Sequence, residues 1–222
     1  MGKLLVLEGL DGCGKQTQTT RLCGAFEQAG TPYRRVSFPD YAQPSSALVK
    51  LYLQGAFGTS PQDVNPYAAS SFFTVDRFAS YRQFWQKDYE AGKVIVADRY
   101  TTSNLVYQLP KLPRGEWDAF TDWLLDFEYT RFELPIPNLT IFLDMSPEAA
   151  ESLLEKRYRG NAEKKDIHEK SRTFQQAGRQ AALYAAQKLQ WQVVSCDTAG
   201  HLRTPAEIQA EILQIVRGQA LL

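Results

Sequence analysis

Residues 4–17 read Leu-Leu-Val-Leu-Glu-Gly-Leu-Asp-Gly-Cys-Gly-Lys-Gln-Thr, and this stretch decides the fold. The apolar run 4–7 has the length of a buried strand, and a helical pattern follows Lys15 without Gly or Pro until Gly24. A glycine-rich turn between a strand and a helix can direct several backbone N–H groups toward phosphate oxygens. Lys15 adds a positive charge that can reach the β- and γ-phosphates of a nucleotide. The stretch therefore predicts a phosphate-binding loop, with a chance glycine-rich turn as the alternative.

One position departs from the usual pattern of such loops. The residue after the lysine is normally Ser or Thr, whose hydroxyl binds Mg²⁺, whereas this chain has Gln16 followed by Thr17. The amide oxygen of Gln16 could still ligate Mg²⁺, and Thr17 could bond an α-phosphate oxygen. We expect the nucleotide to be bound by Gly9, Asp11, Gly12, Cys13, Gly14, Lys15, Gln16 and Thr17.

The composition excludes several classes of protein. With 222 residues, 44% of them hydrophobic and 23% charged, the chain has the make-up of a soluble globular protein with one domain, or one domain with an appended flap. A net charge of zero gives no support to a nucleic-acid or membrane-surface partner, and no apolar stretch approaches the ~20 residues of a membrane span. The three cysteines and two histidines are scattered, which predicts neither disulfides nor a zinc site. With no signal peptide before the first strand, we expect a cytoplasmic protein.

Short apolar runs and helical patterns alternate along the rest of the chain. After the first strand, we expect strands at 33–38, 94–97, 139–143 and 191–196. The expected helices lie at 15–28, from 44 into the 50s, at 67–90, at 117–127, from 147, through 174–189 and at 205–216. This alternation predicts an α/β fold with a parallel sheet, helices on both faces and a ligand site outside the carboxyl ends of the strands.

Charged residues follow the third and fourth of these strands. Asp98 and Arg99 come directly after the third strand, and Asp144 follows the fourth. Asp98 could hold Mg²⁺ through water, or it could orient Arg99 or Arg77 as an ion-pair partner. Phe73 and Arg77 lie four residues apart on an expected helix, so they could present a ring and a guanidinium to the same base. Apolar residues at this spacing are more often plain core, and the residues alone leave both alternatives open.

The stretch from Arg157 to Lys170 is rich in charge, contains Gly160 and has no apolar anchor. This composition is typical of a mobile lid over phosphates, and equally of a solvated loop.

Five motifs together resemble the thymidylate kinase family. They are the loop at 9–15, Phe38-Pro39, Asp76-Arg77, the run D-R-Y-x-x-S-N-x-x-Y-Q at 98–108, and the run K-D-I-H-E at 165–169. The resemblance spans nearly the whole chain in the same order. It implies a P-loop nucleoside monophosphate kinase fold in a single domain over 1–222, with a five-stranded parallel sheet and a lid at about 157–170. The implied reaction is phosphoryl transfer from ATP to dTMP with Mg²⁺, giving ADP and dTDP, carried out by a homodimer.

The resemblance also implies roles for the residues that match the motifs around the acceptor dTMP. Asp11 would meet the sugar 3′-hydroxyl, and Tyr107 would lie near the 2′ position, where it disfavours ribose. Phe73 would stack on thymine, and Arg77 would hydrogen-bond a thymine carbonyl. The other expected acceptor contacts are Phe38, Ser103, Asn104 and Gln108.

For the phosphates, the resemblance implies that Arg99 grips dTMP and that Asp98 places Mg²⁺ or the acceptor phosphate. Arg157 would lie near adenine. The phosphate loop contains no arginine between its two end glycines, so the cation of the transition state would come from the lid, where Arg159, Lys164 and Lys165 are candidates. The expected catalytic residues are therefore Lys15, Asp98, Arg99, Arg159 and Lys165.

Asp40 keeps a related activity open. In the family, Phe-Pro is often followed by Arg or Glu, whereas Asp40 follows here. An acidic residue after the second strand is typical of a general base in deoxynucleoside kinases. The remaining alternatives are a kinase of another nucleoside monophosphate and a non-catalytic nucleotide-binding protein.

Overall fold

The computed structural model describes residues 1–158, 167–168, 171–198 and 201–222. A five-stranded parallel sheet forms its centre, in the order β2-β3-β1-β4-β5. The strands are β1 (Lys3–Gly9), β2 (Tyr33–Ser37), β3 (Val94–Asp98), β4 (Leu139–Asp144) and β5 (Gln192–Ser195). The three central strands are the apolar runs of the sequence, because a strand in the middle of a parallel sheet is buried on both faces. The predicted fold class is confirmed.

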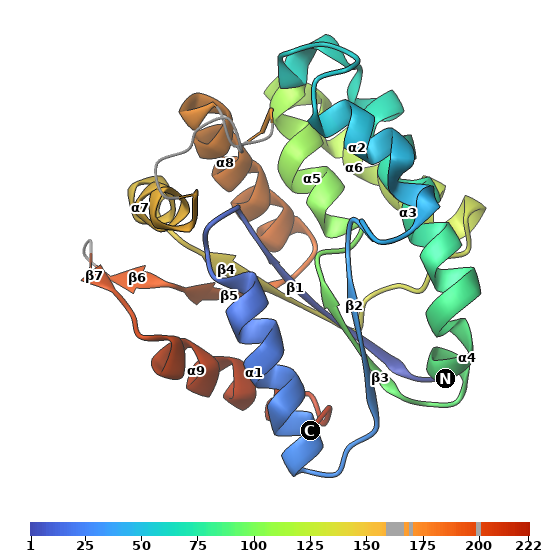
Figure 1. The fold of residues 1–222 in the computed structure, drawn as a ribbon, viewed down its shortest axis with the longest axis vertical. Coiled ribbons are helices and arrows are strands. Elements are labelled where there is room, and N and C mark those ends of the chain that lie inside the picture. Colours follow the sequence, from blue (N-terminus) through green and yellow to red (C-terminus); the bar gives the residue numbers. More distant parts are fainter. Residues whose placement is uncertain (159–166, 169–170, 199–200) are drawn as a thin grey trace.

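Helices cover both faces of the sheet (Figure 1). Because side chains alternate along a strand, Leu5 and Leu7 of β1 pack in a core with α1 (Lys15–Gln28) and α9 (Pro205–Gly218), while Leu4 and Val6 pack with Trp85 on the opposite face. No helix in the described part of the chain is long and apolar enough to cross a membrane. The helices are α1 (Lys15–Gln28), α2 (Ala47–Leu53), α3 (Pro66–Ser80), α4 (Gln86–Glu90), α5 (Thr102–Gln108), α6 (Trp117–Leu125), α7 (Pro147–Tyr158), α8 (Arg172–Lys188) and α9 (Pro205–Gly218).

Four local features differ from the sequence-based expectations. The helix expected over 67–90 contains a π-helical turn, Tyr81–Trp85, and a second such turn, Asp126–Arg131, follows α6. Helix α5 was not expected, because its first turn is Thr-Ser-Asn, residues that favour caps and turns over helix interiors. A short antiparallel hairpin, β6 (Asp197–Thr198) with β7 (His201–Leu202), follows β5.

The predicted lid at 157–170 is described only in part. Residues 159–166 and 169–170, which include the candidate cations Arg159, Lys164 and Lys165, lie outside the described residues. Ile167 and His168 form a turn and are each 4% exposed. Ile167 belongs to a small core cluster with Tyr52 and Leu53. The expectation that this stretch lacks an apolar anchor is therefore wrong, because Ile167 buries its side chain against α2.

Candidate active site

The phosphate loop lies between β1 and α1, as predicted. Gly12 and Gly14 have φ angles of +85° and +86°, which L side chains rarely adopt. A Cβ at Gly12 would also lie 2.7 Å from the carbonyl oxygen of Ala150, so only glycine fits there. The Lys15 Nζ donates to the carbonyl oxygens of Gly9 and Leu10, each at 2.8 Å. The ammonium group is thus held inside the curve of the loop.

The other loop side chains divide by exposure. Gln16 and Thr17 are exposed on the first turn of α1, where their polar atoms are accessible to a nucleotide. Cys13 is buried, and its Sγ lies 3.8 Å from the Lys15 Nζ. Burial raises the pKa of the Cys13 thiol despite the nearby positive charge, so the group stays a neutral packing residue.

Arg99 is the centre of a charged network at the carboxyl end of the sheet. Its φ of +67° turns the chain from β3 toward α5, and its backbone N–H donates to the Leu7 carbonyl at 3.0 Å. The guanidinium donates to Glu8 Oε1 at 3.1 Å and to Asp11 Oδ1 at 2.6 Å. Additional bonds reach Ser103 Oγ and Tyr107 OH. Two carboxylates thereby orient one arginine toward the pocket.

Glu8 is a member of this network that the sequence reasoning missed. Its side chain is fully buried, and besides Arg99 it accepts hydrogen bonds from Thr102 Oγ1 at 2.7 Å and Ser103 Oγ at 2.8 Å. The available signal was a lone carboxylate inside an apolar strand, since a buried charge requires a partner. Glu8 ties β1 to the start of α5 and holds Arg99 in place.

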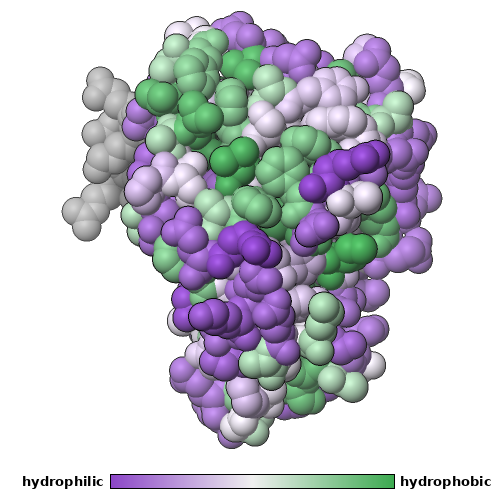
Figure 2. Space-filling model, turned by 90° about the vertical axis from the view of Figure 1, so that its right-hand side faces the viewer, coloured by the Kyte–Doolittle hydropathy of each residue, from purple (hydrophilic) through white to green (hydrophobic). Residues whose placement is uncertain are grey.

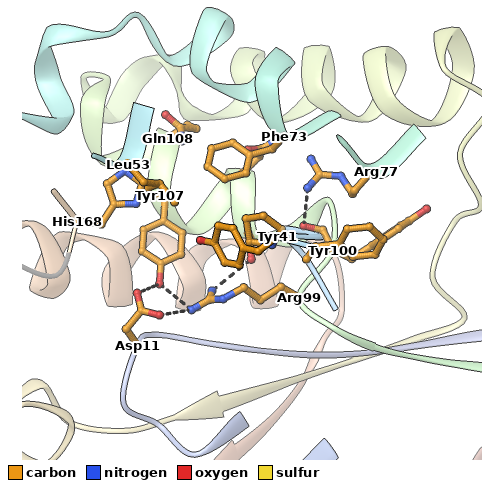
Figure 3. Close-up of a pocket in the computed structure, with 14 residues that line it drawn as sticks. Asp11, Tyr41, Leu53, Phe73, Arg77, Arg99, Tyr100, Tyr107, Gln108 and His168 are labelled. Atoms are coloured by element: carbon orange, nitrogen blue, oxygen red, sulfur yellow. Dashed lines mark hydrogen bonds and ion pairs between the residues drawn. The ribbon is translucent and has the colours of Figure 1, made fainter. Parts of the chain in front are cut away.

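Asp11 and Tyr107 form the second half of the network (Figure 3). The Tyr107 hydroxyl donates to Asp11 Oδ2 at 2.7 Å. Burial by itself would raise the pKa of Asp11, but the charges of Arg99 and Lys15 and the Tyr107 hydrogen bond outweigh it and hold that pKa well below its usual range. Burial raises the pKa of Tyr107 well above its usual value, so its hydroxyl remains a donor. The pair is therefore a carboxylate held by a neutral phenol.

Arg77 is held by a buried carboxylate that the sequence reasoning also missed. Its Nε and Nη2 both donate to Glu128, which is fully buried in the π-helical turn after α6. Asn104 Nδ2 donates to Glu128 Oε1 at 2.8 Å, and Arg77 Nη1 donates to the Tyr100 carbonyl at 3.3 Å. Glu128 thus fixes two of the residues predicted to read the base.

A single pocket brings the predicted acceptor residues together (Figure 3). It is a half-open cavity that combines apolar and aromatic walls with a few convergent polar groups, as small-molecule sites do. Five lining residues were not predicted: Pro39, Tyr41, Leu53, Tyr100 and His168. The predicted residues that line it are Asp11, Phe38, Phe73, Arg77, Arg99, Ser103, Asn104, Tyr107 and Gln108.

Asp98 ends β3 and is 9% exposed. Arg99 pairs with Glu8 and Asp11, and Arg77 pairs with Glu128, so the alternative in which Asp98 orients either arginine is wrong. Within residues 1–158 and the later described segments, no group donates a hydrogen bond to the Asp98 carboxylate. The same residues contain no cluster of three or more His, Cys, Asp or Glu side chains that could enclose a metal ion.

Asp40 and Asp144 lie outside the acceptor pocket. Asp40 accepts from Ser80 Oγ at 3.2 Å and lines a neighbouring groove with Arg34 and Arg35. It is therefore not placed as the general base of a deoxynucleoside kinase. Asp144, at the carboxyl end of β4, accepts two bonds of 2.6 and 2.8 Å from Arg179 of α8, a cation that the sequence reasoning missed. Arg157 is in the last turn of α7, and its side chain lies outside the described part.

Comparisons with known proteins agree with this geometry. A family model described as Thymidylate kinase matches residues 7–203. A thymidylate kinase of Mycobacterium tuberculosis is 31% identical over 205 residues, covering 87% of this chain and 92% of that protein. One of Caenorhabditis elegans is 30% identical over 158 residues, covering 67% and 66%. A solved structure of thymidylate kinase from Candida albicans, 23% identical, shares the fold with a TM-score of 0.72 over 99% of this chain and 93% of that chain. The chain therefore belongs to the thymidylate kinase family of phosphotransferases.

Proposed function

We propose that this protein transfers the γ-phosphoryl group of ATP to dTMP and gives ADP and dTDP. The observation that carries the proposal is the position of Asp11, which belongs to the phosphate loop and also lines the pocket beside Arg99. The phosphate loop, which would bind ATP, and the pocket, which would bind dTMP, are therefore adjacent and share Asp11. Phosphoryl transfer depends on such placement of donor and acceptor oxygens in line, with positive charge close by.

In this proposal the phosphate of dTMP lies against Arg99. Glu8 and Asp11 hold the guanidinium before the acceptor arrives, so little ordering is needed when it binds. Asp11 then accepts from the sugar 3′-hydroxyl, and the Tyr107 hydroxyl lies near C2′, where it leaves little space for a ribose hydroxyl.

Thymine would lie at the other end of the pocket, against the ring of Phe73. The amide oxygen and nitrogen of Gln108 are buried and have no hydrogen-bond partner among the described residues. Buried polar atoms without partners destabilise a protein by about 1–3 kcal/mol each. A carbonyl and an imide N–H of thymine would satisfy both, and the second hydrogen of Arg77 Nη1 adds a further donor at this end.

Mg²⁺ fits the residues at the rim. This ion prefers oxygen ligands and usually keeps one or two carboxylates together with phosphate oxygens and water. The Asp98 carboxylate and the exposed amide oxygen of Gln16 are the groups that would hold it. When bound, Mg²⁺ neutralises charge on the β- and γ-phosphates. Arg159 and Lys165 remain predicted transition-state cations, and Arg157 a predicted adenine contact.

The test is acceptor-dependent release of ADP from ATP, measured in a coupled assay with dTMP, dUMP, dCMP, UMP and thymidine. We expect dTMP to give the highest kcat/KM. A preference for another nucleoside monophosphate would show that this nucleotide is the acceptor in place of dTMP. A preference for thymidine would indicate a deoxynucleoside kinase. ATP binding without release of ADP for any acceptor would indicate a non-catalytic nucleotide-binding protein.

Glu128→Gln tests how the base end of the pocket is held. The substitution keeps the shape but leaves Arg77 buried without its counter-charge. Because hydrogen bonds to charged groups contribute about 1.5–3 kcal/mol, we expect kcat/KM for dTMP to fall about 10- to 150-fold, mainly through KM. The exposed Glu116→Gln is the control and should leave kcat/KM unchanged. Wild-type kinetics in Glu128→Gln would show that Arg77 does not depend on this carboxylate.

We infer that the protein forms a homodimer through α2 and α3. Leu48 and Leu51 of α2 and Val75 and Phe78 of α3 are 44%, 42%, 44% and 38% exposed. Figure 2 shows hydrophobic residues gathered in the upper part of the face that carries these helices. A cluster of large exposed apolar side chains is typical of an interaction surface, and a second copy of the same chain would cover it.

Val75→Glu tests the dimer. Because the inferred interface would bury this apolar face of α3, a charge at position 75 would lose its water on association, so we expect sedimentation to report a monomer for the variant and a dimer for the wild type. Leu202→Glu introduces the same charge at a 45% exposed position on β7 and should leave the dimer intact. A wild-type monomer at micromolar concentration, or a dimeric Val75→Glu, would contradict the inference.

We also infer a cytoplasmic location. Cys13, Cys23 and Cys196 are all buried and none forms a disulfide. Free thiols persist in a reducing compartment, and this supports the location expected from the sequence.

A further inference from the structure

His168 is the one part of the predicted lid whose side chain reaches the acceptor pocket within the described residues. Its imidazole lies parallel to the ring of Tyr107, with 4.9 Å between the centroids and 10° between the planes (Figure 3). The Tyr107 hydroxyl is the group that contacts Asp11. One end of the Tyr107 side chain is therefore fixed by the charged network, and its flat face is covered by His168.

Among the described residues, Tyr52, Phe174 and Gln175 hold His168 in this position. Tyr52 OH lies 2.9 Å from His168 Nε2, and Phe174 packs on the imidazole with 5.2 Å between centroids. The main chain of the turn is held on both sides, because Ile167 N–H donates to the Leu53 carbonyl and Gln175 Nε2 donates to the His168 carbonyl. The stack on Tyr107 is thus built by contacts from α2 and α8, and is not a chance contact of a surface side chain.

The imidazole is held in its neutral form. Lys111 Nζ donates to Tyr52 OH at 2.8 Å, and Tyr52 OH shares a hydrogen bond of 2.9 Å with His168 Nε2. Burial, together with the charge of Lys111, lowers the pKa of His168 to about 3. A neutral ring is the form that can lie flat on Tyr107 without placing a second cation beside Arg99.

We propose that His168 is a positioning residue that sets discrimination between deoxyribose and ribose acceptors. By covering the face of Tyr107, it prevents that ring from turning away from the sugar, so the hydroxyl stays where a 2′-hydroxyl would need to be. Loss of the stack leaves the ring held only through its contacts with Asp11 and Arg99, so the ring can tilt about its hydroxyl and open space at C2′. The inference rests on the proposed function, because it takes dTMP as the acceptor with its sugar against Asp11 and Tyr107.

The experiment compares kcat/KM for dTMP and for ribothymidine 5′-monophosphate in the wild type, His168→Ala and His168→Phe. We expect the dTMP preference to fall roughly 3- to 10-fold in His168→Ala, the scale of a lost aromatic stack. His168→Phe keeps a flat ring on Tyr107 and should retain the wild-type ratio. His201→Ala, at the exposed second histidine, is the matched control and should also retain it.

A purely structural role would lower kcat/KM for both acceptors equally and leave their ratio unchanged, which would overturn the proposal. An equal fall in the preference for dTMP in His168→Phe and His168→Ala would overturn it as well, because a flat ring on Tyr107 would then not be what maintains that preference. If the alanine variant does not fold, His168→Leu fills the same space without a flat ring and must show the reduced ratio. Wild-type release of ADP with dTMP separates these outcomes from failure of the proposed function, in which that release is absent.

Discussion

Lys15→Met lowers kcat for ADP release by about 10²- to 10³-fold, the loss that follows removal of one preorganised donor to developing charge. Lys15 carries the positive charge of the phosphate loop, and its Nζ is held by the carbonyl oxygens of Gly9 and Leu10. Methionine has similar length and apolar bulk but neither the charge nor the N–H groups. The loss should appear in kcat with saturating dTMP, because the acceptor pocket does not include Lys15.

The fold of this variant should persist. The two lost bonds are charge-assisted and contribute about 1.5–3 kcal/mol each, but the substitution also removes the cost of burying the ammonium charge, so the net loss stays below the roughly 5–15 kcal/mol that stabilises a domain. Lys3→Met is the matched control, because Lys3 is exposed at the opposite end of β1 and should retain wild-type turnover. Turnover within threefold of the wild type in a folded Lys15→Met would remove the phosphate-loop interpretation altogether.

Arg99→Met has two effects, one on the reaction and one on the fold. It removes the cation that the proposal places on the dTMP phosphate, so kcat/KM for dTMP should fall by about 10- to 150-fold, the scale of a lost hydrogen bond to a charged group. It also leaves Glu8 fully buried without its counter-charge, and breaking a buried ion pair typically costs about 3–5 kcal/mol. Steady-state kinetics and urea unfolding measure the two effects separately.

The pH dependence of unfolding identifies the contribution of Asp11. Its folded-state pKa lies below the ordinary value of 3.8, so the carboxylate adds stability above that pH and the contribution is lost as pH falls through the folded-state pKa. Without Arg99, the largest charge that lowers this pKa is gone while burial continues to raise it. In Arg99→Met, the fall in the free energy of unfolding at acid pH (the acid limb of the stability curve) should therefore begin at a higher pH than in the wild type.

An exposed ion pair provides the control for this prediction. Arg131 pairs with Asp126, but the two side chains are 71% and 49% exposed, so Arg131→Met should change stability by less than about 1 kcal/mol. It should also leave the acid limb and the dTMP kinetics unchanged. An Arg99→Met protein as stable as Arg131→Met, with an unmoved acid limb, would show that Asp11 and Glu8 do not depend on Arg99.

Much of the fold could be predicted from local pattern. The apolar runs became β1, β3 and β4, because a strand buried on both faces needs nearly continuous apolar residues. Helix α1 has the predicted bounds, with Gly14 supplying the positive φ at its start. The two π-helical turns and α5 could not be predicted, because they follow from packing around Trp85, Glu128 and the charged network and not from propensity.

Part of the pocket lining was also predictable, since the nine residues expected to contact dTMP all line it, whereas five other lining residues were not expected. Asp11, Phe38 and Arg99 follow the carboxyl ends of β1, β2 and β3, which placed them at one edge of the sheet, and the remaining residues come from α3 and α5. Phe73 could not be assigned from spacing, because a core residue and a pocket wall share the same helical period. In the structure, the ring of Phe73 lines the pocket and packs edge-on against Tyr52.

Residue types and their order along the chain thus determined the parallel sheet, the phosphate loop and the edge at which the site lies, because these depend on local periodicity and on glycine. Only the tertiary structure decided which charges pair. Arg77 and Glu128 are 51 residues apart in the sequence, and Arg99 and Glu8 are 91 apart. His168 meets Tyr52 across 116 residues. Burial makes such partners obligatory, but a one-dimensional pattern does not say which distant group will provide them.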